Sequence, residues 1–164
     1  MMTKEQKLII KISILVLAIV CIISLIIRVS TNQKGEFVIP EKETNAMDGK
    51  PSDMPKDCVY QEAKVNNDYI VYLCAAPLFV DNKLDIYFTS SANNKGLMRI
   101  KVLDLQNNVI GESGLINPNS YIKYVLLNKN LESNERITIK IMHYEKETYY
   151  SLGEIKIDLH VRTK

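Results

Sequence analysis

Four stretches between residues 83 and 162 alternate apolar and polar side chains with a period of two. They are Lys83–Ser90, Leu97–Asp104, Arg136–Tyr144 and Glu154–Arg162. This period puts alternate side chains on opposite faces of a β-strand. We therefore expect strands with one buried and one solvated face, as in antiparallel sheets. The residues expected to face the core are Leu84, Ile86, Phe88, Met98, Ile100, Val102, Ile137, Ile139, Ile141, His143, Ile155, Ile157, Leu159 and Val161.

Turn-forming residues separate these stretches at short intervals. Asn tolerates positive φ angles, so Gln106–Asn108 predicts a tight hairpin. Asn117–Ser120 predicts a type I turn with Pro118 at its second position, and Glu145–Glu147 is expected to close the last hairpin. About seven short strands in residues 58–164 predict an all-β fold, an antiparallel β-sandwich, with a barrel as the alternative.

The N-terminal segment has a different pattern, a long apolar run without a polar face. Leu8–Ile27 contains 20 residues and a single charge, Lys11. At about 1.5 Å per residue this length matches a hydrocarbon core of roughly 30 Å, and the Lys11 amine can reach the headgroups. Arg28–Thr31 lacks the small residues of a signal-peptidase site, so we expect an uncleaved signal anchor. A buried helix in a soluble protein is the alternative.

Charges on either side of this run predict its orientation. Lys4, Lys7 and Lys11 stand before it or at its start, against Arg28 and Lys34 after it. Because cytoplasmic flanks carry the excess of basic residues, we expect the N-terminus in the cytoplasm and the rest of the chain outside. The predicted location is the cell membrane, which the chain crosses once.

These patterns divide the chain into four parts. They are a cytoplasmic N-terminus (1–7), a transmembrane helix (8–28), a flexible extracytoplasmic linker (29–57) and the β-sandwich (58–164). The linker is expected because it contains three of the five prolines and its apolar residues follow no period.

The segment from Leu131 to Ile139 resembles part of a known fold. It is similar to the L-x-x-G-x-Y-x-V corner that leads into the penultimate strand of immunoglobulin-like and fibronectin-like domains. Asn134 stands at the glycine position and can adopt the same left-handed geometry. Arg136 stands at the tyrosine position, so the hydrogen bond of the tyrosine corner is missing. The resemblance covers about residues 69–164 and implies an Ig-like fold without implying a function.

Two of the three cysteines, Cys58 and Cys74, lie in the predicted extracytoplasmic domain. A hairpin loop of three or five residues centred on Asn66 would make them face each other. A two-residue turn at Asn66–Asn67 would shift the register by one and separate them. An exported domain permits a disulfide, and two separate buried thiols are the alternative.

The sequence contains few groups suited to catalysis. Of two histidines, His143 falls on an apolar strand face, where we expect a hydrogen-bonded core or edge residue, and His160 falls on a polar face. The motifs G-x-S-x-G and H-E-x-x-H and phosphate-binding glycine loops are absent. Oxygen-bearing side chains at Asp81–Asp85 and at Asp104 suit ordinary turns or calcium. We expect no catalytic residue, no metal site, no cofactor and no enzymatic activity.

The last hairpin is the predicted interaction surface. Its residues are Tyr144, Glu145, Lys146, Glu147, Tyr149 and Tyr150. Tyrosine is a frequent anchor of protein interfaces and can also stack on sugars, although the absence of Trp weakens the second role. Packing of the tyrosines across strand faces is the alternative.

Charge narrows the range of partners. The chain has 21 Lys and Arg against 19 Asp and Glu, a net charge of +2, and no basic cluster that would favour nucleic acid. The bias toward Lys, Asn and Ile is typical of AT-rich bacterial genomes. We expect a non-catalytic, membrane-anchored interaction module, an accessory or scaffold part of a bacterial cell-envelope assembly such as a surface, secretion or conjugation apparatus.

The expected partners are the bilayer, through residues 8–28, and another envelope protein. A module that binds glycan or cell wall through its tyrosines is the alternative, and an envelope hydrolase is a third hypothesis.

Overall fold

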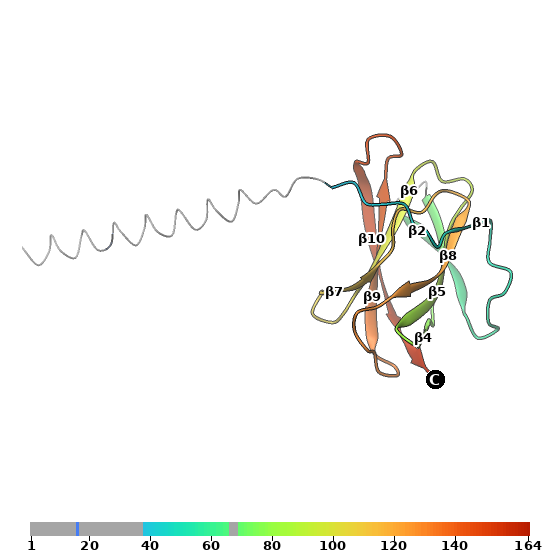
Figure 1. Cartoon of the computed structure of the whole chain (residues 1–164), viewed down its shortest axis with the longest axis vertical. Coiled ribbons are helices and arrows are strands. Elements are labelled where there is room, and N and C mark those ends of the chain that lie inside the picture. The colour runs from blue at the N-terminus through green and yellow to red at the C-terminus, as the bar shows by residue number, and fades with distance from the viewer. Residues whose placement is uncertain (1–15, 17–37, 66–68) are drawn as a thin grey trace, which may run out of the picture. The chain divides into compact units, whose positions relative to one another are not determined.

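The computed structural model describes Val16, residues 38–65 and residues 69–164 (Figure 1). The predicted cytoplasmic segment and, apart from Val16, the predicted anchor lie outside the described residues, as does the linker up to residue 37. No helix that the structure describes is long and apolar enough to cross a membrane. The strands are β1 (Met47–Asp48), β2 (Tyr60–Val65), β3 (Tyr69–Cys74), β4 (Leu78–Val80), β5 (Lys83–Ser90), β6 (Leu97–Leu103), β7 (Val109–Glu112), β8 (Ser120–Leu126), β9 (Arg136–Tyr144), β10 (Ser151–His160) and β11 (Arg162–Thr163).

These strands form two sheets. The first has the order β1-β8-β5-β3-β2, with β4 paired to both β5 and β11, and the second has the order β10-β9-β6-β7. All pairs are antiparallel except β11 with β4. The predicted all-β class and antiparallel sheets are confirmed. The described residues form eleven strands rather than about seven, because β1, β4 and β11 have only two or three residues and are too short to show a period.

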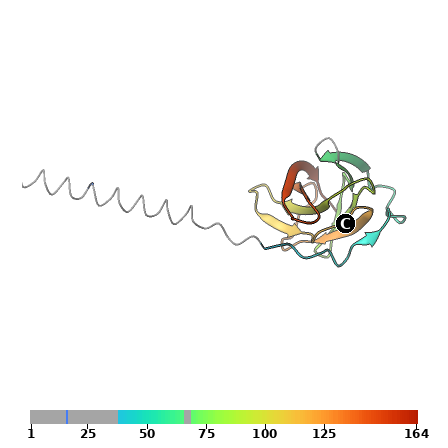
Figure 2. The ribbon, with the colours of Figure 1, turned by 90° about the horizontal axis from the view of Figure 1, so that it is seen from above.

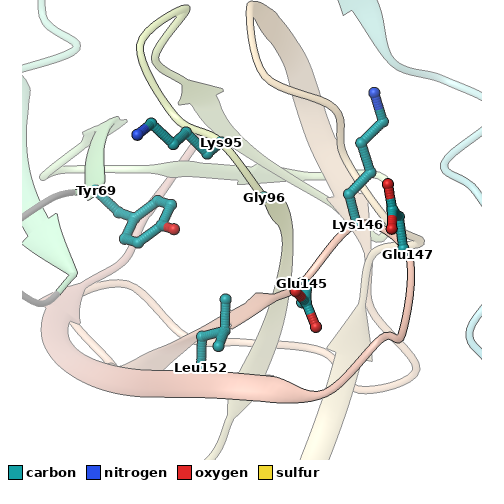
Figure 3. A pocket seen from close by; sticks show the side chains of 7 residues that line it. All are labelled: Tyr69, Lys95, Gly96, Glu145, Lys146, Glu147 and Leu152. Carbon is teal, nitrogen blue, oxygen red and sulfur yellow. The ribbon is translucent and has the colours of Figure 1, made fainter.

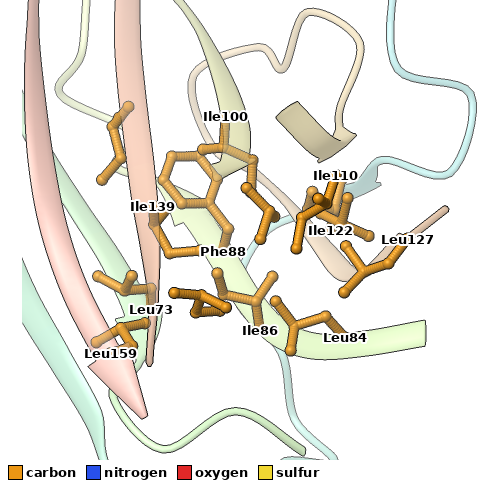
Figure 4. Packing of buried hydrophobic residues seen from close by; sticks show 14 of the residues in the cluster. Leu73, Leu84, Ile86, Phe88, Ile100, Ile110, Ile122, Leu127, Ile139 and Leu159 are labelled. Atoms are coloured by element: carbon orange, nitrogen blue, oxygen red, sulfur yellow. The ribbon is translucent and has the colours of Figure 1, made fainter. Parts of the chain in front are cut away.

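The main core lies between the two sheets. Phe88 on β5 and Ile100 and Ile139 on the facing sheet are fully buried in one cluster (Figure 4). All the residues predicted to face the core are buried except Ile155 and Ile157, which are half-buried because β10 is an end strand. Each large apolar side chain buried here contributes roughly 1.5–3 kcal/mol to folding.

Strand β5 contains a bulge at Tyr87. Its pairing with β8 is interrupted between Asp85 and Phe88, and Tyr87 has a φ of 50°. An extra residue in left-handed geometry is typical of a β-bulge. Tyr87 is 2% exposed and packs in a small separate cluster with Cys58 and Cys74.

Residues 39–57, which we call the strap, belong to the folded unit, whose first residue is Ile39. In Figure 2 the strap, coloured blue to cyan, follows one side of the body. The Glu43 amide donates a 2.9 Å hydrogen bond to the Leu115 carbonyl, and the Glu43 carboxylate accepts a 2.7 Å hydrogen bond from the Gly114 amide. A Cβ on Gly114 would lie 2.6 Å from the Glu43 nitrogen, so this close approach requires glycine.

The strap corrects the predicted domain boundary. The expected start of the domain at Cys58 moves to Ile39, and residues 39–57, about two thirds of the predicted linker, belong to the folded unit. Backbone hydrogen bonds hold much of the strap, including the pairing of β1 with β8. Hydrogen bonds between backbone groups do not require apolar side chains at a regular spacing. The sequence of the strap therefore shows no hydrophobic period and suggested a loose tether.

Strand β11 joins the C-terminal segment to the first sheet. Arg162 pairs with Leu78, and its amide donates a 2.9 Å hydrogen bond to the Pro77 carbonyl. Its guanidinium donates to the Ala76 carbonyl at 2.8 Å and forms an ion pair with Asp57 of the strap. The hydrogen bond from Arg162 lowers the pKa of Asp57. Arg162 therefore links three segments that are distant in sequence.

Asparagines occupy the turns, largely as predicted. Asn107 has a φ of 63° in the predicted hairpin, and Asn134 has a φ of 66°, which confirms its left-handed geometry. Asn119 has a φ of 58°. Because the third residue of a type I turn has a φ near −90°, the predicted type I turn at Asn117–Ser120 is wrong, and the positive φ is typical of type II.

Candidate functional site

The hairpin between β9 and β10 is closed by a network at its tip. The Glu145 amide donates a 2.9 Å hydrogen bond to the Tyr150 carbonyl, and the Tyr149 amide donates a 3.1 Å hydrogen bond to the Glu145 carbonyl. The Thr148 hydroxyl also bonds to the Glu145 carboxylate. Tyr149 has a φ of 58°, a left-handed conformation that reverses the chain. The tip is therefore a defined turn, and its backbone fixes the positions from which residues 145–147 project.

A hollow of about 340 Å³ lies beside this tip. Its lining residues come from four places in the chain: the start of β3, the loop before β6, the tip and the start of β10. They are Tyr69, Lys95, Gly96, Glu145, Lys146, Glu147 and Leu152. We call this feature the hairpin hollow. Figure 3 shows the Tyr69 ring, the Leu152 side chain and the Glu145 carboxylate around it, with Lys146 and Glu147 next to each other at the tip.

His143, on β9, contacts two residues that line the hairpin hollow, Tyr69 and Gly96. It is 0% exposed, and neither ring nitrogen has a hydrogen-bond partner among the described residues. Its ring centroid is 3.4 Å from that of Tyr69. Burial lowers the pKa of His143, because a charged imidazolium would lose its hydration there. The predicted burial of His143 on the apolar face is confirmed, whereas its predicted hydrogen bonding is not found.

Gly96 separates His143 from the hollow. A Cβ on Gly96 would lie 2.2 Å from the His143 Nε2 and 2.4 Å from the Tyr144 carbonyl oxygen. Any side chain at position 96 would therefore displace His143 or the end of β9. Glycine here lets the loop before β6 cover the imidazole.

The predicted interaction surface separates into exposed and buried parts. Glu145, Lys146 and Glu147 are exposed and line the hollow, and Tyr150 is 73% exposed. Tyr144 is only 9% exposed, because it packs in a second core cluster with Leu97, Leu115 and Met142, and half-buried Tyr149 packs against it. Only one of the three predicted tyrosines is therefore available as a flat platform.

Part of the hollow comes from elements outside the hairpin, and the sequence did not predict it. Tyr69, Lys95 and Gly96 join the tip only through the pairing of β9 with β6 and the packing of the two sheets, whereas Leu152 follows the tip in the same hairpin. Tyr69 and the adjacent Lys95 and Gly96 lie in two separate segments without a shared motif, so no sequence signal could have grouped them with the tip.

The chemistry of the hairpin hollow favours recognition of a polar ligand. Two carboxylates, Glu145 and Glu147, are balanced by two amines, Lys95 and Lys146, beside the phenol of Tyr69. Its volume is at the lower end of the range for ligand pockets and could accept a few side chains of a partner. In the part of the chain that the structure describes, no group of three or more His, Cys, Asp or Glu could hold a metal ion.

Cys58 and Cys74 are free, buried thiols in the structure. Residue 74 pairs with Tyr60, so the register differs by two residues from the one that would make the cysteines face each other. A shift of two keeps both on the same sheet face. The thiols remain in contact, and burial together with the hydrogen bond to Cys74 raises the pKa of Cys58 to about 12. Of the two alternatives that the sequence left open, the structure has two buried thiols that no disulfide joins.

The remaining polar candidates serve as structural groups. The Asp104 carboxylate accepts hydrogen bonds from the amides of Gln106 (3.0 Å) and Asn108 (2.9 Å), so it organises its turn. Exposed His160 lies with its Nδ1 3.2 Å from the Asn134 carbonyl oxygen. Asp81 and Asn82, with φ angles of 51° and 60°, form the tight turn between β4 and β5.

Comparison of the chain with known protein families, with characterised proteins and with solved structures finds no match.

Proposed function

We propose that this protein is a non-catalytic interaction module that binds another protein of the bacterial cell envelope through the hairpin hollow. The observation that carries the proposal is the convergence of Glu145, Lys146 and Glu147, predicted as interaction residues, with Tyr69 and Lys95 around one hollow. Charged side chains of both signs on a defined turn suit a partner segment of mixed charge, because complementary charges fix orientation and register.

Exposed Tyr150 extends this surface. Its side chain is 73% exposed at the end of the hairpin tip. A tyrosine in this position can bury a large apolar ring in a partner while its hydroxyl remains hydrogen-bonded. The burial of Tyr144 leaves a narrower aromatic surface than a sugar platform needs, which favours a protein partner over a glycan.

The burial of His143 supports a non-catalytic role. A general base must come within hydrogen-bond reach of the proton that it removes. The imidazole is 0% exposed and Gly96 lies between it and the hollow. A hydrolase that used this histidine would need a rearrangement of the loop before β6.

The proposal keeps the expected membrane attachment. Residues 8–28 are proposed to anchor the chain with its N-terminus in the cytoplasm, and the sandwich, proposed to be Ig-like, would lie outside the membrane. The left-handed Asn134 before β9 supports the Ig-like assignment. Anchoring would confine the hairpin hollow to the membrane surface and raise its effective concentration toward an envelope partner.

The test is capture of the full chain from its own membranes in mild detergent, compared with the charge-swapped variant Lys146→Glu/Glu147→Lys. This variant keeps the net charge but reverses the pattern at the hairpin tip. Its matched control is Glu41→Lys/Lys42→Glu, which swaps two adjacent exposed charges on the strap.

We expect one partner at near equal amounts with the unmodified chain and the control, and its loss with the Lys146 and Glu147 swap. Equal recovery with both variants would contradict the proposed surface. Depletion of the chain by purified wall polymer without any protein partner would instead support glycan binding.

A further inference from the structure

Strand β10 has a free edge. It is the end strand of the second sheet, and over Glu154–His160 its backbone pairs with β9 alone among the described residues. A bulge between Ser151 and Gly153 bounds this stretch at one end, and the crossing to β11 bounds it at the other. The unpaired N–H and C=O groups of such an edge can pair with another strand.

The side chains of this edge alternate in chemistry as well as in direction. Four polar residues lie on the outer face of the sheet, and three apolar residues lie on the inner face. The outer residues are Glu154, Lys156, Asp158 and His160, and the inner residues are Ile155, Ile157 and Leu159. The four outer residues and the half-buried Ile155 and Ile157 are therefore available to match an incoming strand, whereas Leu159 is already buried in the core.

The edge is complementary to itself when two copies run antiparallel about Ile157. In that register Lys156 lies opposite Asp158 of the second copy, and Glu154 lies opposite its His160. Ile155 lies opposite Leu159 on the inner face. A twofold axis through Ile157 makes each of these pairs occur twice. We propose that two copies of this chain associate through β10 in this register and join their second sheets into one continuous sheet.

Charge and the bulge at the start of β10 together select this register over its neighbours. Centring the pair on Lys156 would place Lys156 opposite itself and Glu154 opposite Asp158. Centring on Asp158 would place that carboxylate opposite itself. Centring on Ile155 would pair Glu154 with Lys156, but it would place Leu152 opposite Asp158 and include the bulge between Ser151 and Gly153 in the pairing. Like charges directly opposite one another destabilise a strand pair, whereas opposite charges stabilise it.

Contacts within the chain prepare this edge for a partner. The Asp158 carboxylate is held on the outer face by Arg136 at 2.5 Å and by Thr138 at 2.6 Å. Exposed Lys156 has no ion-pair partner in residues 38–65 and 69–164. Ile157 is half-buried, so a second strand would cover apolar surface that one copy leaves partly exposed. Strand β2 lies beside β10 on the facing sheet, but among the strands that the structure describes it pairs only with β3, which leaves the β10 edge open.

The experiment measures self-association of the full chain in mild detergent by sedimentation equilibrium. Three variants are compared with the unmodified chain: Lys156→Glu, the swap Lys156→Asp/Asp158→Lys, and Lys56→Glu as an exposed control with the same change in charge. In Lys156→Glu two attractive pairs per dimer become repulsive, so the dissociation constant should rise about thirtyfold. The swap should bring it back to within a few fold, and Lys56→Glu should leave it unchanged.

Zero-length carbodiimide cross-linking gives a second readout that locates the contact. A mixture of ¹⁴N-labelled and ¹⁵N-labelled chains should yield a peptide in which Lys156 of one isotope is joined to Asp158 of the other. A chain that is monomeric at all concentrations overturns the proposal. So does a dimer that Lys156→Glu and Lys56→Glu affect equally, or a Lys156–Asp158 cross-link found only within one isotope.

Discussion

Replacement of the buried His143 by leucine should remove a source of acid instability. His143 is fully buried, its nitrogens have no partner among the described residues, and its ring packs against Tyr69. Leucine is close in volume to histidine and carries no polar atom, so the substitution should cost less than about 1.5 kcal/mol in packing. Each buried polar atom without a partner costs about 1–3 kcal/mol. At pH 7.5, His143→Leu should therefore unfold with at least the free energy of the unmodified domain.

The pH dependence gives the sharper expectation. Burial lowers the pKa of His143 in the folded state below the ordinary value of 6.5. As the pH falls below 6.5, the unfolded chain gains a proton at this residue while the folded chain does not. The free energy of unfolding therefore keeps its full value above about pH 6.5. It decreases as the pH falls from 6.5 toward the folded-state pKa of His143, by up to about 1.4 kcal/mol per pH unit. Between pH 7.5 and pH 5.5, the free energy of unfolding of His143→Leu should therefore rise by up to about 1.4 kcal/mol relative to that of the unmodified domain.

Urea unfolding of residues 39–164 at half-unit pH steps from 7.5 to 5 would measure this difference. His160→Gln is the matched control, since it removes an exposed histidine from β10 and should retain the acid loss of the unmodified domain. Parallel pH curves for the unmodified domain and His143→Leu would refute the reasoning. An NMR titration of the His143 ring with a midpoint at or above 6.5 would refute it as well.

Three further outcomes follow from the geometry. Gly114→Ala should destabilise the domain by about 1–3 kcal/mol, because the new Cβ would lie 2.6 Å from the nitrogen of the strap residue Glu43, and hydrogen exchange should then speed up at the Glu43 amide. Phe88→Ala should cost about 3–5 kcal/mol in urea unfolding, whereas Leu126→Ala, at a side chain 59% exposed, should change stability by less than about 0.5 kcal/mol. Because burial and contact with a second thiol raise the pKa of Cys58 to about 12, iodoacetamide at pH 8 should label Cys58 slowly in the folded domain and rapidly in urea, as read by peptide mass spectrometry.

The sequence predicted the parts of the fold that depend on alternation. The ranges Lys83–Ser90 and Arg136–Tyr144 were expected as strands and are strands with those bounds. Their inward residues are buried because a period of two leaves no other way to cover one apolar face. The strap could not be predicted in this way, since it is held largely by backbone hydrogen bonds, which any sequence can make.

The candidate site was predicted in part for a related reason. Glu145, Lys146 and Glu147 were found because one hairpin keeps them adjacent in sequence. Tyr69 and Lys95 were not found, because only the packing of the sheets brings them to the tip. The lack of a partner for His143 was also beyond the pattern, since alternation predicts the direction of a side chain and not its hydrogen bonds.

The position of Arg162 has a consequence for how the domain folds. This residue pairs with Leu78 and contacts Ala76 and Asp57, so its native contacts span more than half of the chain. Contacts between residues that are far apart in the sequence form late and slow the folding of β proteins. A chain still being synthesised therefore lacks the residue that ties the strap to the first sheet. The domain should reach its native state only after residue 162 has left the ribosome. Until then its unpaired strands would need protection from aggregation.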